Sequence, residues 1–412
     1  MTTPNEPSTD RPPVNADVQP LTDAAELTQQ VRIGKFKIPT EALRAYTMMF
    51  ALVAIWLFFQ WATIDARNPY GLFLSGVNFS KLMQQTAVTG VLAVGMLMVI
   101  VSGNIDLSVG SLVGLAGATA ALAQGRGLVF ALGIAIVVAV VVGAFQGALV
   151  AYVNVPAFIV TLGGLLAWPG ISFWRTQGST IPVEIPFFRK IGVENVPPEI
   201  GYLLAVLVIA AIVWFSFQQN RSRRRHGLSP RSLVATIVGI VFPAAVTIAF
   251  VLLMNSQGGI PILFIIMFAV ALFGAFLTQN TTFGRYLYAI GGNPEAARLS
   301  GINLRRHILA VFALMGALVG IAAILHTARL SAATPDAGRL MELDAIAACV
   351  IGGTSLMGGR GTVFGAIVGA LIMASLDNGM NLVGVQSYVQ PIVKGAVLVT
   401  AVGLDMAGRR KS

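Results

Sequence analysis

The sequence has few charged residues for its length. Only 11 % of its 412 residues are Asp, Glu, Lys or Arg, whereas 56 % are apolar. Soluble globular domains carry about a quarter charged residues, so this chain cannot cover a water-facing surface of ordinary composition. Its apolar residues form long runs rather than amphipathic stripes. The sequence therefore predicts an all-α, polytopic membrane protein.

Metal-ligating patterns are also scarce. The single cysteine, Cys349, excludes an intramolecular disulfide framework and any cysteine-built zinc site. The three histidines stand alone in the sequence, without the spacing of metal ligands. We expect this chain to bind no metal and no cofactor.

Nucleotide-binding and catalytic motifs are missing as well. A P-loop needs Gly-x4-Gly-Lys followed by Ser or Thr, but the nearest approach, Gly353–Gly358, is followed by Gly359 and Arg360. Neither His-Glu-x-x-His nor Gly-x-Ser-x-Gly occurs. The ionisable residues of the apolar segments, most of them near segment ends, are Asp106, Glu342, Asp344, Asp377, Lys394 and Asp405. The chain is thus not expected to be an enzyme, and any ATP hydrolysis belongs to another chain.

The N-terminal residues differ in composition from the rest. Residues 1–27 are rich in Thr, Pro, Asn, Asp and Glu and have no apolar period, which is typical of disorder. They also lack the apolar core of a cleaved signal peptide. We expect a largely disordered tail over residues 1–44, a transmembrane domain over 45–408 and a basic C-terminus over 409–412.

Twelve apolar segments follow the tail. Eight have about the 20 residues that a helix needs to cross a bilayer: Ala45–Thr63, Leu82–Ser102, Leu128–Val153, Ile200–Gln218, Ser232–Met254, Ile260–Thr278, Ile308–Leu325 and Tyr388–Met406. Four are shorter or are interrupted by Gly and Pro: Ile105–Ala123, Pro156–Trp174, Met341–Met357 and Thr362–Leu376. Twelve crossings, or ten crossings with two re-entrant segments, both place the two termini on one side.

Basic residues indicate which side that is. With twelve crossings, most Lys and Arg residues fall on the side of the termini, and the positive-inside bias makes that side cytoplasmic. Two long loops, 219–231 and 279–307, lie there. The Arg cluster at 221–231 favours a topology anchor, with binding of anionic lipid head groups as the second interpretation. The net charge of +10 therefore does not indicate nucleic-acid binding.

Two Gly-rich stretches, one in each half of the chain, carry polar residues. They read GNIDLSVGSLVGLAG at 103–117 and GGTSLMGGRGTVFGAIVG at 352–369. An ionised Asp106 in hydrocarbon is costly, so it should face a polar cavity or cap the next helix. Broken helices of this kind line the pathways of transporters, whereas plain packing through glycine is the alternative. The candidate pathway residues are Asn104, Asp106, Ser108, Ser111, Thr161, Gly352, Gly353, Thr354 and Ser355.

The loop at 282–306 carries complete start and stop signals of a helix. Asn293 is a suitable N-cap, Pro294 suits the first helical position, and Gly301 can close the helix in a left-handed conformation. Glu295 lies at the positive helix end and can pair with Arg298 one turn later. The pattern predicts a helix of about two turns that serves as a docking element, with a mere connection as the alternative.

Three blocks of sequence resemble a known family. They are GNIDLSVGSLVGLAG, PAFIVTLGGLLA at Pro156–Ala167, and GRYLYAIGGNPEAARLSGI together with LDAIAACVIGGTSLMGGRGTVFGAIVGAL. These blocks resemble the permease subunits of bacterial ABC importers for monosaccharides, the ribose, xylose and galactose group. The resemblance spans nearly all of Leu82–Gly408. The Arg-rich loop and the extra apolar pair near 232–278 are most similar to xylose-type members.

The resemblance implies an inner-membrane permease that translocates a monosaccharide, such as the pentose xylose, and works as a dimer. It also implies two partners, a cytoplasmic ATP-hydrolysing subunit and a periplasmic sugar-binding protein. Docking on the ATPase would fall to the coupling loop, namely Gly284, Arg285, Gly291, Gly292, Asn293, Pro294, Glu295, Ala296, Ala297, Arg298 and Gly301. The alternative is a stand-alone secondary transporter. Such carriers hold several ionisable or ion-coordinating groups near the membrane midplane, and Asp106 alone does not supply such a set.

Removing residues 1–27 should leave membrane insertion and transport intact, because this segment cannot bury apolar surface. Sugar uptake by the truncated and full-length proteins, compared at equal membrane abundance, measures this. Loss of uptake at normal abundance would show that the tail has a partner.

Overall fold

The computed structural model describes residues 30–33, 36–65, 68–225 and 233–409. Most of the predicted N-terminal tail, the second half of the Arg-rich loop and residues 410–412 lie outside the described residues. The chain divides into two compact units, residues 1–47 and 48–412, which are described separately.

The first unit contains a short antiparallel hairpin that the composition of the tail did not predict. Strand β1 (Gln30–Ile33) pairs with β2 (Phe36–Pro39), and Gln30 lies opposite Pro39. Both strands alternate apolar and polar residues, which is the two-residue period of a strand. Helix α1 (Thr40–Ala62) begins directly after β2 and continues into the second unit.

The described part of the second unit is almost entirely helical, which confirms the all-α fold class. After α1 the helices are α2 (Gly76–Val101), α3 (Val109–Ala123), α4 (Leu128–Ala151), α5 (Ala157–Thr176), α6 (Pro186–Val193), α7 (Pro198–Arg225), α8 (Leu233–Asn255), α9 (Ile262–Asn280), α10 (Thr282–Gly292), α11 (Pro294–Leu299), α12 (Leu304–Leu330), α13 (Met341–Ile351), α14 (Val363–Leu382) and α15 (Gln390–Arg409). A 3-10 turn, η1 (Gln124–Arg126), follows α3, and a two-residue ladder joins β3 (Ile181–Pro182) to β4 (Ala332–Ala333).

Each of the twelve predicted apolar segments overlaps one of these helices. Among the described residues, eight helices are long and apolar enough to cross a membrane: α2, α4, α5, α7, α8, α9, α12 and α14. Two segments that looked short, at α5 and α14, are therefore full-length helices. In contrast, α3 and α13 have 15 and 11 residues, or about 22 and 16 Å, and cannot cross a bilayer core of about 30 Å alone.

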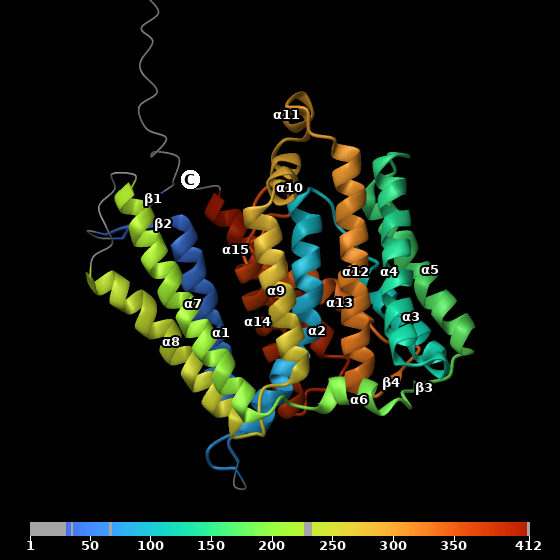
Figure 1. The fold of residues 1–412 in the computed structure, drawn as a ribbon, viewed down its shortest axis with the longest axis horizontal. Helices are drawn as coiled ribbons and strands as arrows, with labels where there is room; N and C mark the ends of the chain where they lie inside the picture. The colour runs from blue at the N-terminus through green and yellow to red at the C-terminus, as the bar shows by residue number, and fades with distance from the viewer. Residues whose placement is uncertain (1–29, 34–35, 66–67, 226–232, 410–412) are drawn as a thin grey trace, which may run out of the picture. The chain divides into compact units, whose positions relative to one another are not determined.

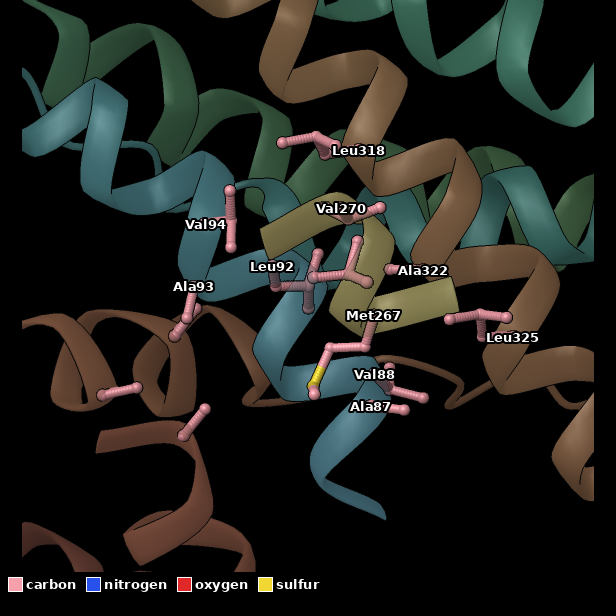
Figure 2. Close-up of a cluster of buried hydrophobic side chains, with 14 of the residues drawn as sticks. Ala87, Val88, Leu92, Ala93, Val94, Met267, Val270, Leu318, Ala322 and Leu325 are labelled. Carbon is pink, nitrogen blue, oxygen red and sulfur yellow. The ribbon is translucent and has the colours of Figure 1, made fainter. Parts of the chain in front are cut away.

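Helix α2 lies at the centre of the second unit. Its side chains are buried along nearly the whole helix, and it contacts α9, α12, α13 and α14. Figure 2 shows buried side chains of this core, with Ala87, Val88, Leu92, Ala93 and Val94 from α2, Met267 and Val270 from α9, and Leu318, Ala322 and Leu325 from α12. From Ala87 onward the helix is apolar on nearly every side, and such a stretch is expected to be buried.

Helices α4 and α12 cross at a contact between two glycines. A side chain on Gly143 would collide with the Phe312 carbonyl and lie 3.1 Å from the Gly316 Cα. A side chain on Gly316 would collide with the Ala139 carbonyl in the same way. Small residues let membrane helices approach to backbone contact and gain dispersion energy, so this crossing fixes α4 against α12.

The helix ends gather at two opposite faces (Figure 1). One, the α11 face, holds α10, α11 and the end of α2. The other, the α6 face, holds α6, β3 and β4, and there Val183 donates a backbone hydrogen bond to Ser331. The two short helices α3 and α13 lie between these faces and position the site described below.

Replacing Gly143 by Leu should lower the free energy of unfolding by about 1–3 kcal/mol, because the new side chain forces α4 away from α12. Gly133→Leu is the matched control on the same helix, since a Cβ there meets no atom within 4 Å. The thermal midpoints of the two purified variants measure the difference. Equal midpoints would contradict the close crossing.

Candidate functional site

The connection between α2 and α3 holds the buried carboxylate predicted from sequence. Asp106 is 3 % exposed. Its Oδ1 accepts hydrogen bonds from the Ser108 amide (2.8 Å) and the Ser108 hydroxyl (2.7 Å). Asp106 therefore holds the turn that precedes α3, whereas Ser108 stands at the N-cap position without a side-chain cap.

Two neighbouring helices complete this polar cluster. Gln146 of α4 donates to the Ser108 hydroxyl (2.9 Å). Thr161 of α5 donates to the Ile105 carbonyl (3.4 Å), and Ser111 of α3 donates to the Gly164 carbonyl of α5 (3.4 Å). Four predicted pathway residues, Asp106, Ser108, Ser111 and Thr161, thus lie together.

Two buried polar atoms near the cluster have no hydrogen-bond partner among the described residues. They are Trp168 Nε1 of α5 and Glu342 Oε2 of α13. A Cβ on Gly164 would collide with Gln146 and Trp168 and lie 2.9 Å from the Ser108 Cβ, so Trp168 borders the cluster directly. The Glu342 carboxylate lies against Gly110, in the first turn of α3. An indole N–H and a carboxylate oxygen can bond with the hydroxyl groups of a solute.

Neither Gln146 nor Trp168 was predicted from the sequence to take part in the site, and Glu342 was predicted only as one of the ionisable residues of the apolar segments. A polar amide in the middle of the apolar run at 128–153 was the available signal for Gln146. Its role depends on a contact between residues 38 positions apart, which no local pattern contains.

The second predicted group, Gly352–Ser355, forms the turn that follows α13. Gly353 has a φ of +85°, and the Thr354 amide donates to the Cys349 carbonyl (2.9 Å). Gly352 packs against the backbone of Gly365, a close approach that small residues allow. Among the described residues, no hydrogen bond links this turn to Asp106. The side-chain amide of Asn104 donates to the carbonyl and the hydroxyl of Ser102 and not to Asp106.

Both broken segments nevertheless meet at the end of α2. The Gly359 amide donates to the Val101 carbonyl (2.9 Å). A Cβ on Gly358 would lie 2.7 Å from the Gly291 carbonyl and 3.1 Å from the Gly103 Cα. Three glycines, from the α2–α3 connection, the end of α10 and the α13–α14 loop, therefore touch through their backbones. We call Gly103, Gly291 and Gly358 the glycine junction.

The predicted short helix is confirmed as α11. Asn293 Oδ1 accepts from the amides of Glu295 (3.1 Å) and Ala296 (3.0 Å). At the other end Gly301 has a φ of +84°, and the Ile302 amide donates to the Ala297 carbonyl (3.1 Å), which is the Schellman closure. The predicted pair of Glu295 and Arg298 is not among the ion pairs of the described residues.

Helix α10, which the sequence did not predict, connects α11 to the membrane helices. Leu287 and Ile290 are buried, and Gly284 packs against the backbone of Leu277 and Thr278. The Tyr288 hydroxyl donates to the Gly361 carbonyl (2.7 Å), and burial raises the pKa of this hydroxyl, so it stays protonated. Displacement of α10 would therefore act directly on the α13–α14 loop.

The predicted coupling residues divide by exposure. Gly284 and Ala297 are buried and Gly291 is half-buried in the glycine junction, so these three serve packing. The exposed members are Arg285, Gly292, Asn293, Pro294, Glu295, Ala296, Arg298 and Gly301. Most of the exposed set lies in α11 or directly beside it in sequence, and α11 stands at the α11 face (Figure 1).

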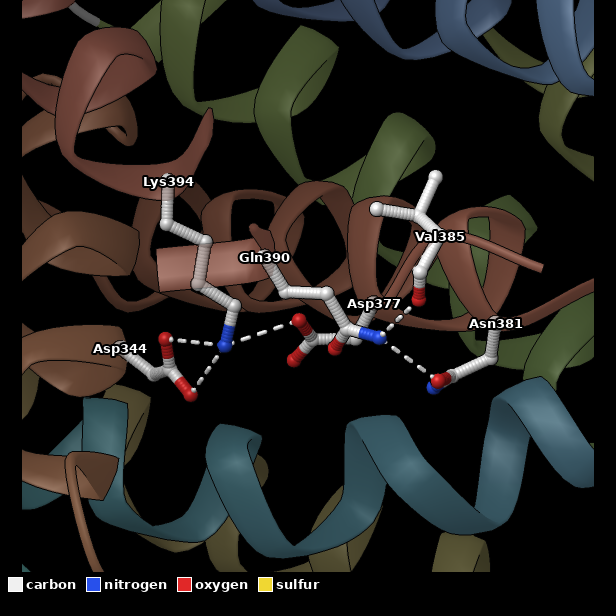
Figure 3. A network of polar contacts seen from close by, with 6 residues as sticks. All are labelled: Asp344, Asp377, Asn381, Val385, Gln390 and Lys394. Atoms are coloured by element: carbon white, nitrogen blue, oxygen red, sulfur yellow. Dashed lines mark hydrogen bonds and ion pairs between the residues drawn. The ribbon is translucent and has the colours of Figure 1, made fainter. Parts of the chain in front are cut away.

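Three of the remaining ionisable residues satisfy one another in an ion-pair cluster (Figure 3). Lys394 Nζ of α15 lies 2.9 Å from Asp344 Oδ1 of α13 and 2.8 Å from Asp377 Oδ1 of α14. Gln390 donates to Asn381 (2.8 Å) beside it. This cluster holds three helices together and explains why α14 continues past the polar residues where the sequence pattern ended. It leaves these carboxylates little freedom for other chemistry.

Comparison with known families identifies the class of this chain. Residues 78–402 match the family described as "Branched-chain amino acid transport system / permease component". This match covers both broken segments, α10 and α11. The chain belongs to this permease family.

Several relatives of this permease are similar over nearly its whole length. The xylose transport system permease protein XylH of Escherichia coli is 44 % identical over 373 residues, which cover 90 % of this chain and 93 % of that protein. XylH of Haemophilus influenzae is 43 % identical over 91 % of this chain and 100 % of that protein. The ribose import permease protein RbsC of Escherichia coli is 38 % identical over 80 % and 85 %. No solved structure matches this permease.

Changing Asp106 to Leu should reduce transport roughly tenfold, because the Ser108 amide and hydroxyl lose their buried acceptor. Asp106→Asn keeps the capping oxygen and should be milder. Uptake at equal membrane abundance measures both. Normal transport by Asp106→Leu would contradict the placement of Asp106 in the pathway.

Proposed function

We propose that this permease carries a monosaccharide, with xylose as the first candidate, into the cell as the membrane component of an ATP-driven importer. The 44 % identity to XylH over 90 % of the chain supports the substrate class. The polar cluster around Asp106 supports it chemically, because amide, hydroxyl, indole and carboxylate groups suit a neutral solute rich in hydroxyls.

The ATP-driven mechanism is supported mainly by the contacts that connect α11, through α10, to both broken segments. A short helix with both ends closed is rigid, and α11 is exposed except at Ala297. Its neighbour α10 contacts the α2–α3 connection and the α13–α14 loop through the glycine junction. An ATP-hydrolysing subunit that docks on α11 would move both broken segments together. ATP is then used by that partner and not by this chain.

The orientation follows from the same assignment. With α11 in the cytoplasm, the number of crossings expected from the sequence would put both termini there too, and the positive-inside bias of the loops supports this. The periplasmic sugar-binding protein would then dock on the α6 face. Two copies of the permease would enclose the path, as a homodimer.

The pathway assignment rests on the two groups of predicted residues. The Asp106 cluster and the unpartnered atoms of Trp168 and Glu342 are proposed to receive the sugar hydroxyls. Gly352–Ser355 are proposed to form the movable border of the path at the end of α2. Rearrangement of these turns would alternate the access of the site.

The family description favours a second substrate class, branched-chain amino acids. Uptake of labelled xylose, ribose and leucine by cells that express the complete importer discriminates between them. Uptake of leucine alone would overturn the sugar assignment. Gradient-driven uptake by the purified permease in vesicles, without an ATPase, would instead favour the stand-alone secondary transporter.

Three substitutions, two in α11 and one at the glycine that closes its C-terminal end, test the docking surface. Glu295→Lys reverses an exposed charge, Ala296→Trp blocks close approach, and Gly301→Val strains the left-handed helix end. Each should reduce copurification of the ATPase and sugar uptake, while the permease still inserts and its sugar-binding protein still binds sugar.

Glu199→Lys is the matched control, because it makes the same charge reversal on an exposed glutamate in the first turn of α7. It should leave copurification of the ATPase unchanged. Full uptake and normal ATPase binding by all three α11 variants would make this loop a mere connector.

A further inference from the structure

A groove between α7, α8 and α9 has no part in the proposed transport path. Its volume is about 1030 Å³. Apolar side chains line most of it, among them Leu207 and Phe215 of α7, Pro243 of α8 and Leu272 of α9. All three helices are long and apolar enough to span the membrane, so the groove opens among lipid-facing side chains.

The sequence of α8 leaves this space open. Gly239 lines the groove, and a Cβ built there meets no atom within 4 Å. Pro243, one turn later, has no amide to bond with the Gly239 carbonyl. A packed membrane helix pair would fill such a gap with side chains, because unfilled apolar walls lose dispersion contacts. An apolar occupant from outside the chain is therefore expected.

The groove becomes polar toward the C-terminal end of α7. Gln218, Gln219 and Ser222 line it there. The last turns of the same helix carry four arginines, and Arg221, Arg224 and Arg225 among them are exposed. From Phe215 to Arg224 the helix rises about 14 Å, roughly one leaflet of the bilayer core.

We propose that this groove is a binding site for an anionic phospholipid of the surrounding bilayer. One acyl chain lies between α7, α8 and α9, and the phosphate head group lies among the arginines at the end of α7. Positive-inside bias alone explains basic residues at this end, but it does not require an open apolar groove that leads to them. The combination of groove, amide and hydroxyl border and basic cluster matches a lipid with a negative head group.

The test uses the full-length permease, purified in mild detergent, washed free of lipid and then mixed with phosphatidylglycerol or phosphatidylcholine. Native mass spectrometry counts the retained lipids. Wild type should retain phosphatidylglycerol at least about fivefold better than phosphatidylcholine, since one basic residue near a head group already contributes that factor. Equal retention of both lipids would overturn the proposal.

Three variants locate the site. Gly239→Leu places side-chain atoms in the groove at a position where a Cβ meets no atom within 4 Å, and it should lose most of the retained phosphatidylglycerol. Gly133→Leu adds the same side chain at an equally open glycine of α4 and should behave as wild type. The double substitution Arg224→Gln and Arg225→Gln should abolish the preference between the two lipids. Unchanged retention by Gly239→Leu would show that the arginines act without the groove, which contradicts the proposal.

A measurement on the wild-type protein does not depend on the folding of any variant. Phosphatidylglycerol with a photoreactive group in its acyl chain should cross-link mainly to residues of the groove on α7, α8 and α9. Adducts spread evenly over other lipid-facing helices, such as α4 and α5, would overturn the proposal.

Discussion

Hydrocarbon offers no hydrogen-bond partners, so every break in a membrane helix must be satisfied inside the protein. This constraint organises the second unit. The break after α2 is satisfied by Asp106, which accepts the amide and hydroxyl of Ser108. The break after α13 is satisfied by backbone bonds from Thr354 to Cys349 and from Gly359 to Val101. Each break thus depends on particular hydrogen bonds, and neither can move unless these bonds are exchanged for others.

The glycine junction makes the two breaks mechanically dependent on one another. Because Gly103, Gly291 and Gly358 touch through their backbones, no flexible side chain lies between them to absorb a displacement. Close-packed contacts transmit small shifts rather than deform continuously. A rigid α11, joined to this point by α10, is therefore well placed to convert docking and release of a partner into movement of both breaks. In contrast, the crossing of α4 and α12 and the Lys394 cluster hold the surrounding helices fixed.

Local signals allowed the sequence to predict the apolar segments, the all-α class and α11. The caps Asn293 and Gly301 act on residues only a few positions away, so their pattern is complete within the sequence. Helix α10 was missed because its buried residues, Leu287 and Ile290, face a surface that only the folded chain provides. The partners of Lys394 and Gln146 were missed for a related reason. Asp344 lies 50 positions from Lys394, and Ser108 lies 38 positions from Gln146, and in an apolar chain many other pairings fit equally well.

Some buried polar groups of the second unit already have hydrogen-bond partners, whereas others have a free donor or acceptor. The Asn78 amide donates to Asn378 (2.8 Å), and the Trp56 indole donates to Ser375 (2.9 Å), so these groups are already paired and join helices. Trp168 Nε1, Glu342 Oε2 and Thr354 Oγ1 are buried without a partner among the described residues, and they belong to α5, to α13 and to the turn after α13. An unpaired buried polar group is unfavourable by about 1–3 kcal/mol, a cost that a solute with several hydroxyls would relieve on reaching these atoms. If they line the path, as proposed above, the same atoms would favour its occupied state.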